Sequence, residues 1–144
     1  MSEMTLSNLA EKMRDIDFCI FSTRNAAGDI ASRPMSNNRD VDYDGDSHFF
    51  SYGATGKVSD IEGDAAVNLA FQGKGGLLGK PPLFVAVTGQ AELIREKAAF
   101  AEHWTPDLDR WFEDGVDTPD MVLIKVRASR IHYWNGEDEG DVAV

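Results

Sequence analysis

The sequence has only one cysteine, Cys19, among its 144 residues. A single cysteine cannot close an intramolecular disulfide, and it cannot by itself build a thiolate metal site. The simplest setting for such a chain is a reducing compartment, so we expect a cytoplasmic protein. Disulfides are not needed at this length, because a chain of this size buries roughly 70% of the surface that its unfolded form exposes. We therefore predict a single domain over residues 1–144.

Long apolar runs are also missing. The longest one, over residues 83–87, has the length of a strand, whereas a membrane-spanning helix needs about 20 apolar residues. Near the start of the chain, Glu3, Glu11 and Lys12 interrupt any apolar segment that a signal peptide would require. No membrane partner is expected.

Basic residues are scarce. The chain carries 14 Lys and Arg against 25 Asp and Glu, which gives a formal net charge of −11. Proteins that bind nucleic acids need a basic face to displace the counterions of the phosphate backbone, so we expect no nucleic-acid partner. A small anionic ligand is compatible with this charge only if a few cations gather in one cleft.

The usual motifs of metal sites and of nucleophilic or nucleotide-hydrolysing enzymes are absent. The three histidines are scattered, without a His-x-x-x-His or Cys-x-x-Cys pair. The loop over residues 40–46 matches the first half of a calcium-binding loop, but Ser51 stands where a glutamate would complete it. There is no Gly-x-Ser-x-Gly motif, and neither Gly-Lys pair has the P-loop spacing. We predict no metal site.

The hydrophobic pattern predicts a chain rich in strands. Leu9 and Met13 recur at helical spacing, whereas Val67, Leu69 and Phe71 alternate with more polar residues as in a half-buried strand. The early connections are too short for crossover helices, which favours antiparallel pairing and a small barrel of the α+β class. The predicted strands span 18–23, 30–36, 48–52, 67–72, 83–94, 121–126 and 130–134, and the predicted helices span 6–15, 57–61 and 95–104.

Two residues predict irregular places in these strands. Pro34 has no N–H to donate to a sheet ladder, so its strand should lie at an edge or carry a bulge. Gly89 lies inside the long strand over 83–94 and predicts a bulge there. The acidic tail over 137–144 is expected to be peripheral or disordered.

The three tryptophans, Trp104, Trp111 and Trp134, all lie in the last third of the chain. Most tryptophans contribute to a core, and core packing is the first interpretation for each of them. Their concentration also suits a self-association face or a wall beside a planar ligand, because aromatic residues are enriched at such surfaces.

An ordered set of short motifs runs through the chain. It comprises Ser32-Arg33-Pro34-Met35-Ser36, Asp44-Gly45-Asp46, Phe49-Phe50-Ser51, Lys57-Val58 and Tyr133-Trp134. Taken together, and in this order, the motifs resemble the FMN-binding split-barrel family of pyridoxamine 5′-phosphate oxidase-like proteins. Within that family the sequence is similar to the general stress protein 26-like branch, over roughly residues 5–136.

The resemblance implies an α+β fold, a six-stranded and mostly antiparallel split β-barrel with peripheral helices. It also implies a homodimer with one FMN in each of two clefts between the subunits. The implied activity is that of an FMN-dependent oxidoreductase acting through flavin N5, with NADH or NADPH as candidate electron donors. The alternatives are a non-catalytic flavin-binding or stress-response protein and, less favoured, a deazaflavin or haem binder. A true pyridoxamine 5′-phosphate oxidase is not expected, because its C-terminal substrate-binding motif is not recognisable in residues 130–134.

The resemblance further assigns cofactor contacts, but no catalytic residue. A flavin phosphate is anionic, and hydrogen bonds from arginine and lysine to such a group are roughly twice as strong as neutral ones. We expect Arg33 and Lys57 to converge on the phosphate, because the overall negative charge otherwise opposes anion binding. The implied contacts are Arg33, Pro34, Met35, Ser36, Phe50, Ser51, Lys57, Val58, Gln72, Trp104, Trp111 and Trp134, with the tryptophans as candidates for contribution by the second subunit.

Overall fold

The computed structural model describes residues 4–37, 42–75 and 77–144. Asp40 and Val41, from the loop that matches half of a calcium-binding loop, lie outside the described residues. The helices are α1 (Leu6–Met13), α2 (Gly56–Gly63) and α3 (Lys97–His103), with short 3₁₀ segments η1 (Leu77–Gly79), η2 (Pro106–Arg110) and η3 (Gly115–Asp117). The strands are β1 (Phe18–Arg24), β2 (Ile30–Ser36), β3 (Asp46–Tyr52), β4 (Ala66–Gln72), β5 (Phe84–Ile94), β6 (Met121–Asn135) and β7 (Asp138–Val142).

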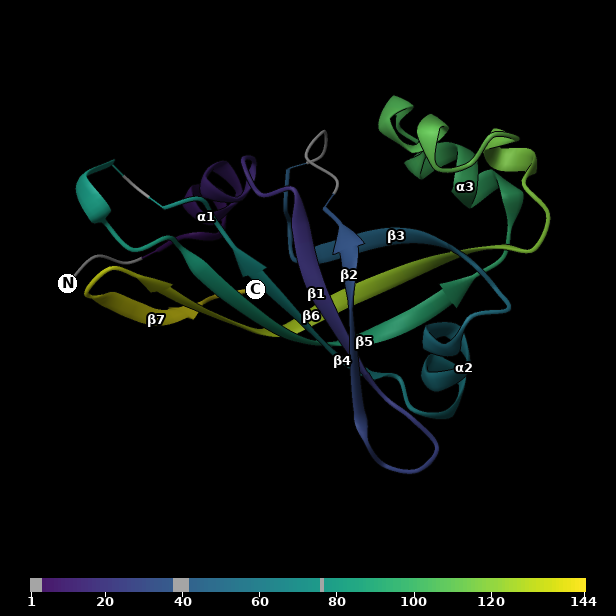
Figure 1. The fold of residues 1–144 in the computed structure, drawn as a ribbon, viewed down its shortest axis with the longest axis horizontal. Coiled ribbons are helices and arrows are strands. Elements are labelled where there is room, and N and C mark those ends of the chain that lie inside the picture. Colours follow the sequence, from purple (N-terminus) through teal and green to yellow (C-terminus); the bar gives the residue numbers. More distant parts are fainter. Residues whose placement is uncertain (1–3, 38–41, 76) are drawn as a thin grey trace.

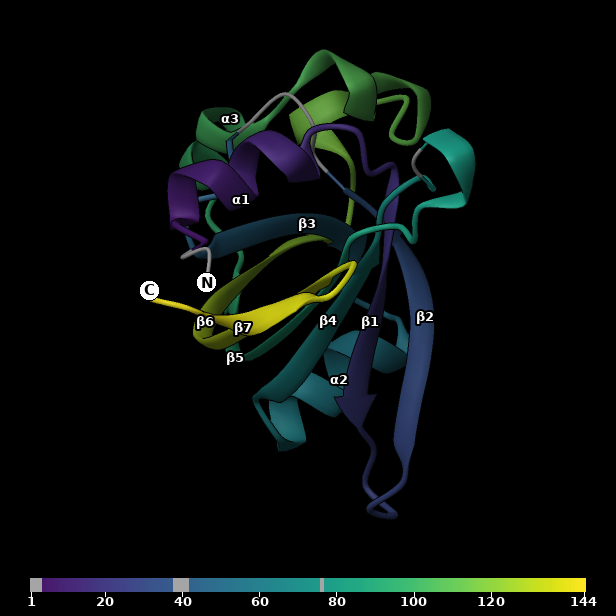
Figure 2. The same ribbon diagram turned by 90° about the vertical axis from the view of Figure 1, so that its left-hand side faces the viewer.

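All seven strands described belong to one antiparallel sheet in the order β2-β1-β4-β5-β6-β3, with β7 added beside β6. The α+β class is confirmed. The prediction of six strands is corrected to seven, and the sheet is curved without closing into a barrel (Figure 2). It ends at β2, where Pro34 offers no N–H for a further ladder bond. The helices α1 and α2 lie at opposite ends of the curved sheet (Figure 1).

The predicted edge strand and the predicted β-bulge are both found at their expected positions. Pro34 lies in the edge strand β2 and pairs with Ile20 of β1. In β5 the register shifts between Thr88 and Gly89, which is the expected bulge. A Cβ atom at Gly89 would overlap the carbonyl oxygen of Arg127 on β6, so only glycine allows the two strands to approach this closely.

The acidic tail differs from its prediction, because Asp138–Val142 forms β7 instead of remaining disordered. Its apolar residue, Val142, is only 3% exposed and joins the main core. Two of its carboxylates contact basic side chains on β6: Glu139 contacts His132, and Asp141 contacts both Arg130 and His132. The sequence also divided residues 121–134 into two strands, but they form part of the single strand β6.

Two hydrophobic clusters organise the fold. The main one fills the concave side of the sheet with inward-facing residues such as Phe21, Leu69 and Ile131, all fully buried. The second contains Phe50, Phe100, Phe112, Met121 and Leu123. It fixes α3 and the segment that follows it against β3 and β6, beside the cleft described below. Among the described residues, none of the helices has the length and apolar character needed to span a membrane.

Candidate functional site: a cleft beside strand β3

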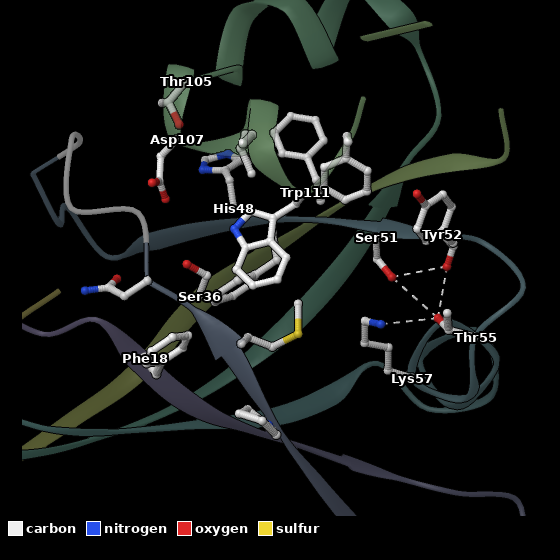
Figure 3. A pocket seen from close by; sticks show the side chains of 17 residues that line it. Phe18, Ser36, His48, Ser51, Tyr52, Thr55, Lys57, Thr105, Asp107 and Trp111 are labelled. Atoms are coloured by element: carbon white, nitrogen blue, oxygen red, sulfur yellow. Dashed lines mark hydrogen bonds between the residues drawn. The ribbon is translucent and has the colours of Figure 1, made fainter. Parts of the chain in front are cut away.

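A cavity of about 420 Å³ opens between β3, the end of β2, the start of α2 and the segment around η2 (Figure 3). This volume lies within the range of small-molecule sites, roughly 300–1,000 Å³. The apolar lining residues are Phe18, Pro34, Met35, Phe49, Phe50, Leu108, Trp111 and Phe112. The polar ones are Ser36, Asn37, His48, Ser51, Tyr52, Thr55, Lys57, Thr105 and Asp107.

The cleft brings together residues that are distant in the sequence. The family resemblance assigned several of them to one cofactor site. The predicted contacts that line it are Pro34, Met35, Ser36, Phe50, Ser51, Lys57 and Trp111. Thr55, Thr105, Asp107 and His48 also line it, although no sequence motif selected them as contacts. Trp111 reaches the cleft of its own chain and is 53% exposed, so no second subunit is needed to bring it there.

One end of the cleft is suited to an anion. Lys57, at the start of α2, points its ammonium toward Thr55 Oγ1 at 3.4 Å, and Ser51 Oγ lies 3.5 Å from the same hydroxyl (Figure 3). The Thr55 side chain does not cap α2, so the helix N-terminus adds a partial positive charge. Burial lowers the pKa of Lys57, and the nearby charge of Arg33 lowers it further. In the part of the chain that the structure describes, no carboxylate forms an ion pair with Lys57.

Arg33 lies behind the cleft and does not line it. Its Nη1 donates to Thr23 Oγ1 at 2.8 Å and to the carbonyl oxygen of Phe21 at 3.2 Å. The Thr23 hydroxyl donates in turn to Asp60 Oδ2 at 2.8 Å, and Arg33 Nη2 lies 3.7 Å from the same carboxylate oxygen. The two predicted cations are therefore near each other, but Asp60 neutralises Arg33, and Lys57 alone faces the cleft.

Sequence reasoning missed Thr23 and Asp60. Thr23 is 2% exposed and occupies an inward position of β1, in alternation with Cys19 and Phe21. A hydroxyl in such a position needs a buried partner, and this was the only sequence feature that could have pointed to the network. The partner is separated from Thr23 by 37 residues, so its identity required the tertiary structure.

The other end of the cleft is formed by His48, Thr105 and Asp107, and Figure 3 shows this group well apart from Lys57. The ring of His48 stacks on the ring of His103 with centroids 3.9 Å apart and planes inclined by 16°. Burial lowers the pKa of His48, and His103 and Lys125 lower it further, against smaller opposite effects of nearby aspartates. His48 therefore presents a neutral ring to the cleft at neutral pH.

The remaining predicted contacts lie elsewhere in this chain. The Val58 side chain is fully buried in the main core. Trp104 packs edge-on against Phe50 and donates its ring N–H to Asp109 at 2.9 Å. Gln72, at the exposed end of β4, and Trp134, on β6, do not line the cleft.

The convex face of the sheet is unusually apolar near the cleft. Phe18 and Ile20 on β1 are 54% and 45% exposed, and Ile20 pairs with Pro34 on β2. Further along the same face, Phe84 pairs with Trp134, and each is 39% exposed. Exposed apolar residues that extend across several strands commonly mark an interaction surface. Phe18 and Pro34 also line the cleft, so the apolar face continues into its mouth.

Comparison with known proteins places the chain in a family. The family model described as pyridoxamine 5′-phosphate oxidase like matches residues 4–144. A protein of Clostridium acetobutylicum related to general stress protein 26 superimposes with a TM-score of 0.77 at 17% identity, covering 98% of this chain and 95% of that chain. General stress protein 26 from Bacillus anthracis gives 0.69 at 20% identity, covering 92% of this chain and 98% of that chain.

A heme binding protein from Mycobacterium smegmatis has a TM-score of 0.70 at 16% identity and covers 98% of this chain and 60% of that chain. No curated protein sequence matches the chain significantly. At these identities the structural matches show the shared fold alone, whereas the family model extends over nearly the whole sequence. The chain belongs to the pyridoxamine 5′-phosphate oxidase-like family.

Proposed function

We propose that the cleft beside β3 binds FMN and that the protein is an FMN-dependent oxidoreductase with an unidentified substrate. The observation that carries this proposal is the position of Lys57, a half-buried cation beside two hydroxyls at one end of a mainly apolar cleft. FMN has the same division, with an anionic phosphate at one end and a flat ring system at the other.

The residues of the cleft fit each part of this cofactor. Lys57, Ser51 and Thr55 would hold the phosphate, because charge-assisted hydrogen bonds favour an ionised acceptor. The backbone of residues 34–36 would face the ring edge, and Trp111 and Phe50 would cover apolar ring surface. When bound, FMN supplies hydride transfer at ring N5. The protein's part is to bind and orient the cofactor and to exclude water from its ring.

We further propose a homodimer formed through the apolar face around Phe18, Ile20, Phe84 and Trp134. Support comes from the exposure of these side chains and from the continuity of the face with the cleft mouth. In such a dimer, Trp134 would approach the cleft of the partner subunit, as the family resemblance implies for one of the tryptophans, and Gln72 lies on the same face, one strand away from Phe84. The proposed compartment is the cytoplasm, where a buried free thiol stays reduced. Cys19 is 1% exposed, and burial raises its pKa to about 12.

The first experiment identifies any chromophore that copurifies and titrates the cofactor-free protein with FMN and with riboflavin. We expect FMN binding with quenched flavin fluorescence, because Trp111 lies in the cleft. Riboflavin lacks the phosphate and should bind roughly 10- to 100-fold more weakly, the value of one charge-assisted hydrogen bond. Protein that has no affinity for FMN would overturn the proposal. A deazaflavin or haem would be recognised by its absorption spectrum.

A second experiment separates an oxidoreductase from a protein that only holds flavin. The FMN-loaded protein is mixed anaerobically with NADH and, separately, with NADPH, and the absorbance of the oxidised flavin is followed. Bleaching with either nucleotide supports an oxidoreductase that uses a nicotinamide donor. Stable flavin absorbance with both favours the flavin-holding alternative or a different donor.

A further inference from the structure

His48 lines two cavities. One is the cleft beside β3, where His48 lies at the end remote from Lys57 (Figure 3). The other is a cavity of about 350 Å³ whose lining includes Asp44, Asp46 and Glu102 as well as the stacked His103. The ring of His48 therefore borders both the cleft and the carboxylate-lined cavity.

Neither ring nitrogen of His48 is engaged within the described parts of the chain, since no hydrogen bond of the described residues involves this ring. A neutral imidazole has one nitrogen that donates and one that accepts. Both are available to a ligand and to water.

Burial and the surrounding charges together favour the neutral ring of His48. The pKa of His48 is lowered chiefly by burial, then by His103 from α3 and Lys125 from β6, while Asp46 and Asp44 oppose the shift. The carboxylates of Asp107 on η2 and of Glu102 on α3 line the two cavities that His48 borders. A negative charge arriving in the cleft would therefore raise the proton affinity of His48.

We propose that His48 exchanges protons with the bound cofactor, taking up one proton when the FMN ring is reduced. This inference rests on the proposed function for the identity of the ligand. A hydride from a nicotinamide donor would carry two electrons and one proton into the ring of bound FMN, and this would leave one negative charge on the reduced ring. The second proton would come from the buffered solvent through the carboxylate-lined cavity and would form an N–H bond on the unprotonated ring nitrogen of His48. Met35, Trp111 and His48 line the same cleft as Lys57, so a cofactor held at Lys57 by its phosphate would have its ring system in the part of the cleft that includes His48.

The test measures how many protons the FMN-loaded protein takes up per electron pair. The midpoint potential is determined spectroscopically with mediator dyes from about pH 5 to pH 8.5, the range in which histidine titrates. His48 has one pKa in the oxidised protein and a higher one in the reduced protein. At pH values between these two, the wild type should take up one more proton per electron pair than His48→Gln. His132→Gln is the matched control, because His132 lies outside the cleft, and its proton uptake per electron pair should equal that of the wild type at every pH at which the variant is folded.

A second variant tests the same residue while His48 is retained. His103→Phe keeps an aromatic ring against His48 but removes the neighbouring charge, so the extra proton uptake should persist and move to higher pH. If the wild type and His48→Gln took up the same number of protons, with FMN bound in both, the role of His48 would be overturned and the proposed function would stand. Failure of the wild type to hold FMN would overturn the proposed function and this inference with it.

Discussion

The two cations near the cleft should respond differently to removal of their charge. Arg33 belongs to a network with Thr23 and Asp60, whereas Lys57 faces the cleft without a carboxylate partner among the described residues. We predict that Arg33→Gln mainly destabilises the fold and that Lys57→Gln mainly weakens FMN binding. The family resemblance alone implies that both substitutions act on the cofactor.

The stability effect follows from the burial of the pair. The side chains of Arg33 and Asp60 are 23% and 14% exposed, so loss of the guanidinium leaves a largely buried carboxylate whose remaining side-chain partner among the described residues is the Thr23 hydroxyl. Breaking a fully buried pair costs about 3–5 kcal/mol. Because both groups retain some contact with water, we expect about 2 kcal/mol for Arg33→Gln, a fall of roughly 4–8 °C in Tm for a domain of this size.

The affinity effect follows from the position of Lys57. Its burial disfavours the charged form, so Lys57→Gln should leave the free energy of unfolding unchanged or slightly higher. The lost charge-assisted hydrogen bond is worth about 1.5–3 kcal/mol, which corresponds to roughly 10- to 100-fold weaker FMN binding. Lys12→Gln on the exposed face of α1 controls for the change in net charge.

Urea unfolding and FMN fluorescence titration measure the two effects separately. The double variant Arg33→Gln with Asp60→Asn should recover much of the stability that Arg33→Gln loses, because no unpaired charge remains buried. The reasoning would be refuted if Arg33→Gln left stability unchanged and weakened FMN binding as strongly as Lys57→Gln. Arg33 would then be a direct ligand of the phosphate.

Three further predictions concern the sheet, the terminal strand and the cleft wall. Gly89→Ala should destabilise the protein by about 1–3 kcal/mol in urea unfolding. The control Gly63→Ala has open space around it and should be neutral or stabilising. Equal effects of the two substitutions on stability would contradict the bulge geometry. Asp141 and Glu139 raise the pKa of His132, so the stability that wild type gains over His132→Gln should be fullest below about pH 6.5 and decline as pH rises through the folded pKa. A stability difference between the wild type and His132→Gln that is equal at pH 5.5 and pH 8.5 would exclude this charge pairing. Trp111→Ala should keep the fold, because the side chain is 53% exposed, and should weaken FMN binding about tenfold in the fluorescence titration.

The sheet and its local features were largely predictable. Alternation of apolar residues located β1 to β5 within a few residues, and Pro34 and Gly89 gave the edge and the bulge because their backbones permit few other arrangements. The tail was not predictable from composition. Its acidic residues suggest disorder in isolation, but in the fold they pair with β6, where Asp141 contacts Arg130 and His132 and Val142 enters the core.

The order of short motifs in the sequence predicted the family membership and the lysine of the cleft, because such motifs can be recognised from residue spacing along the chain. Only the tertiary structure assigned each charged group to its partner. It placed Asp60 against Arg33 and left Lys57 facing the cleft, and it brought His48 of β3 against His103 of α3. These partners are tens of residues apart, and electrostatic interactions depend on distance in space and on burial, which residue spacing alone does not define.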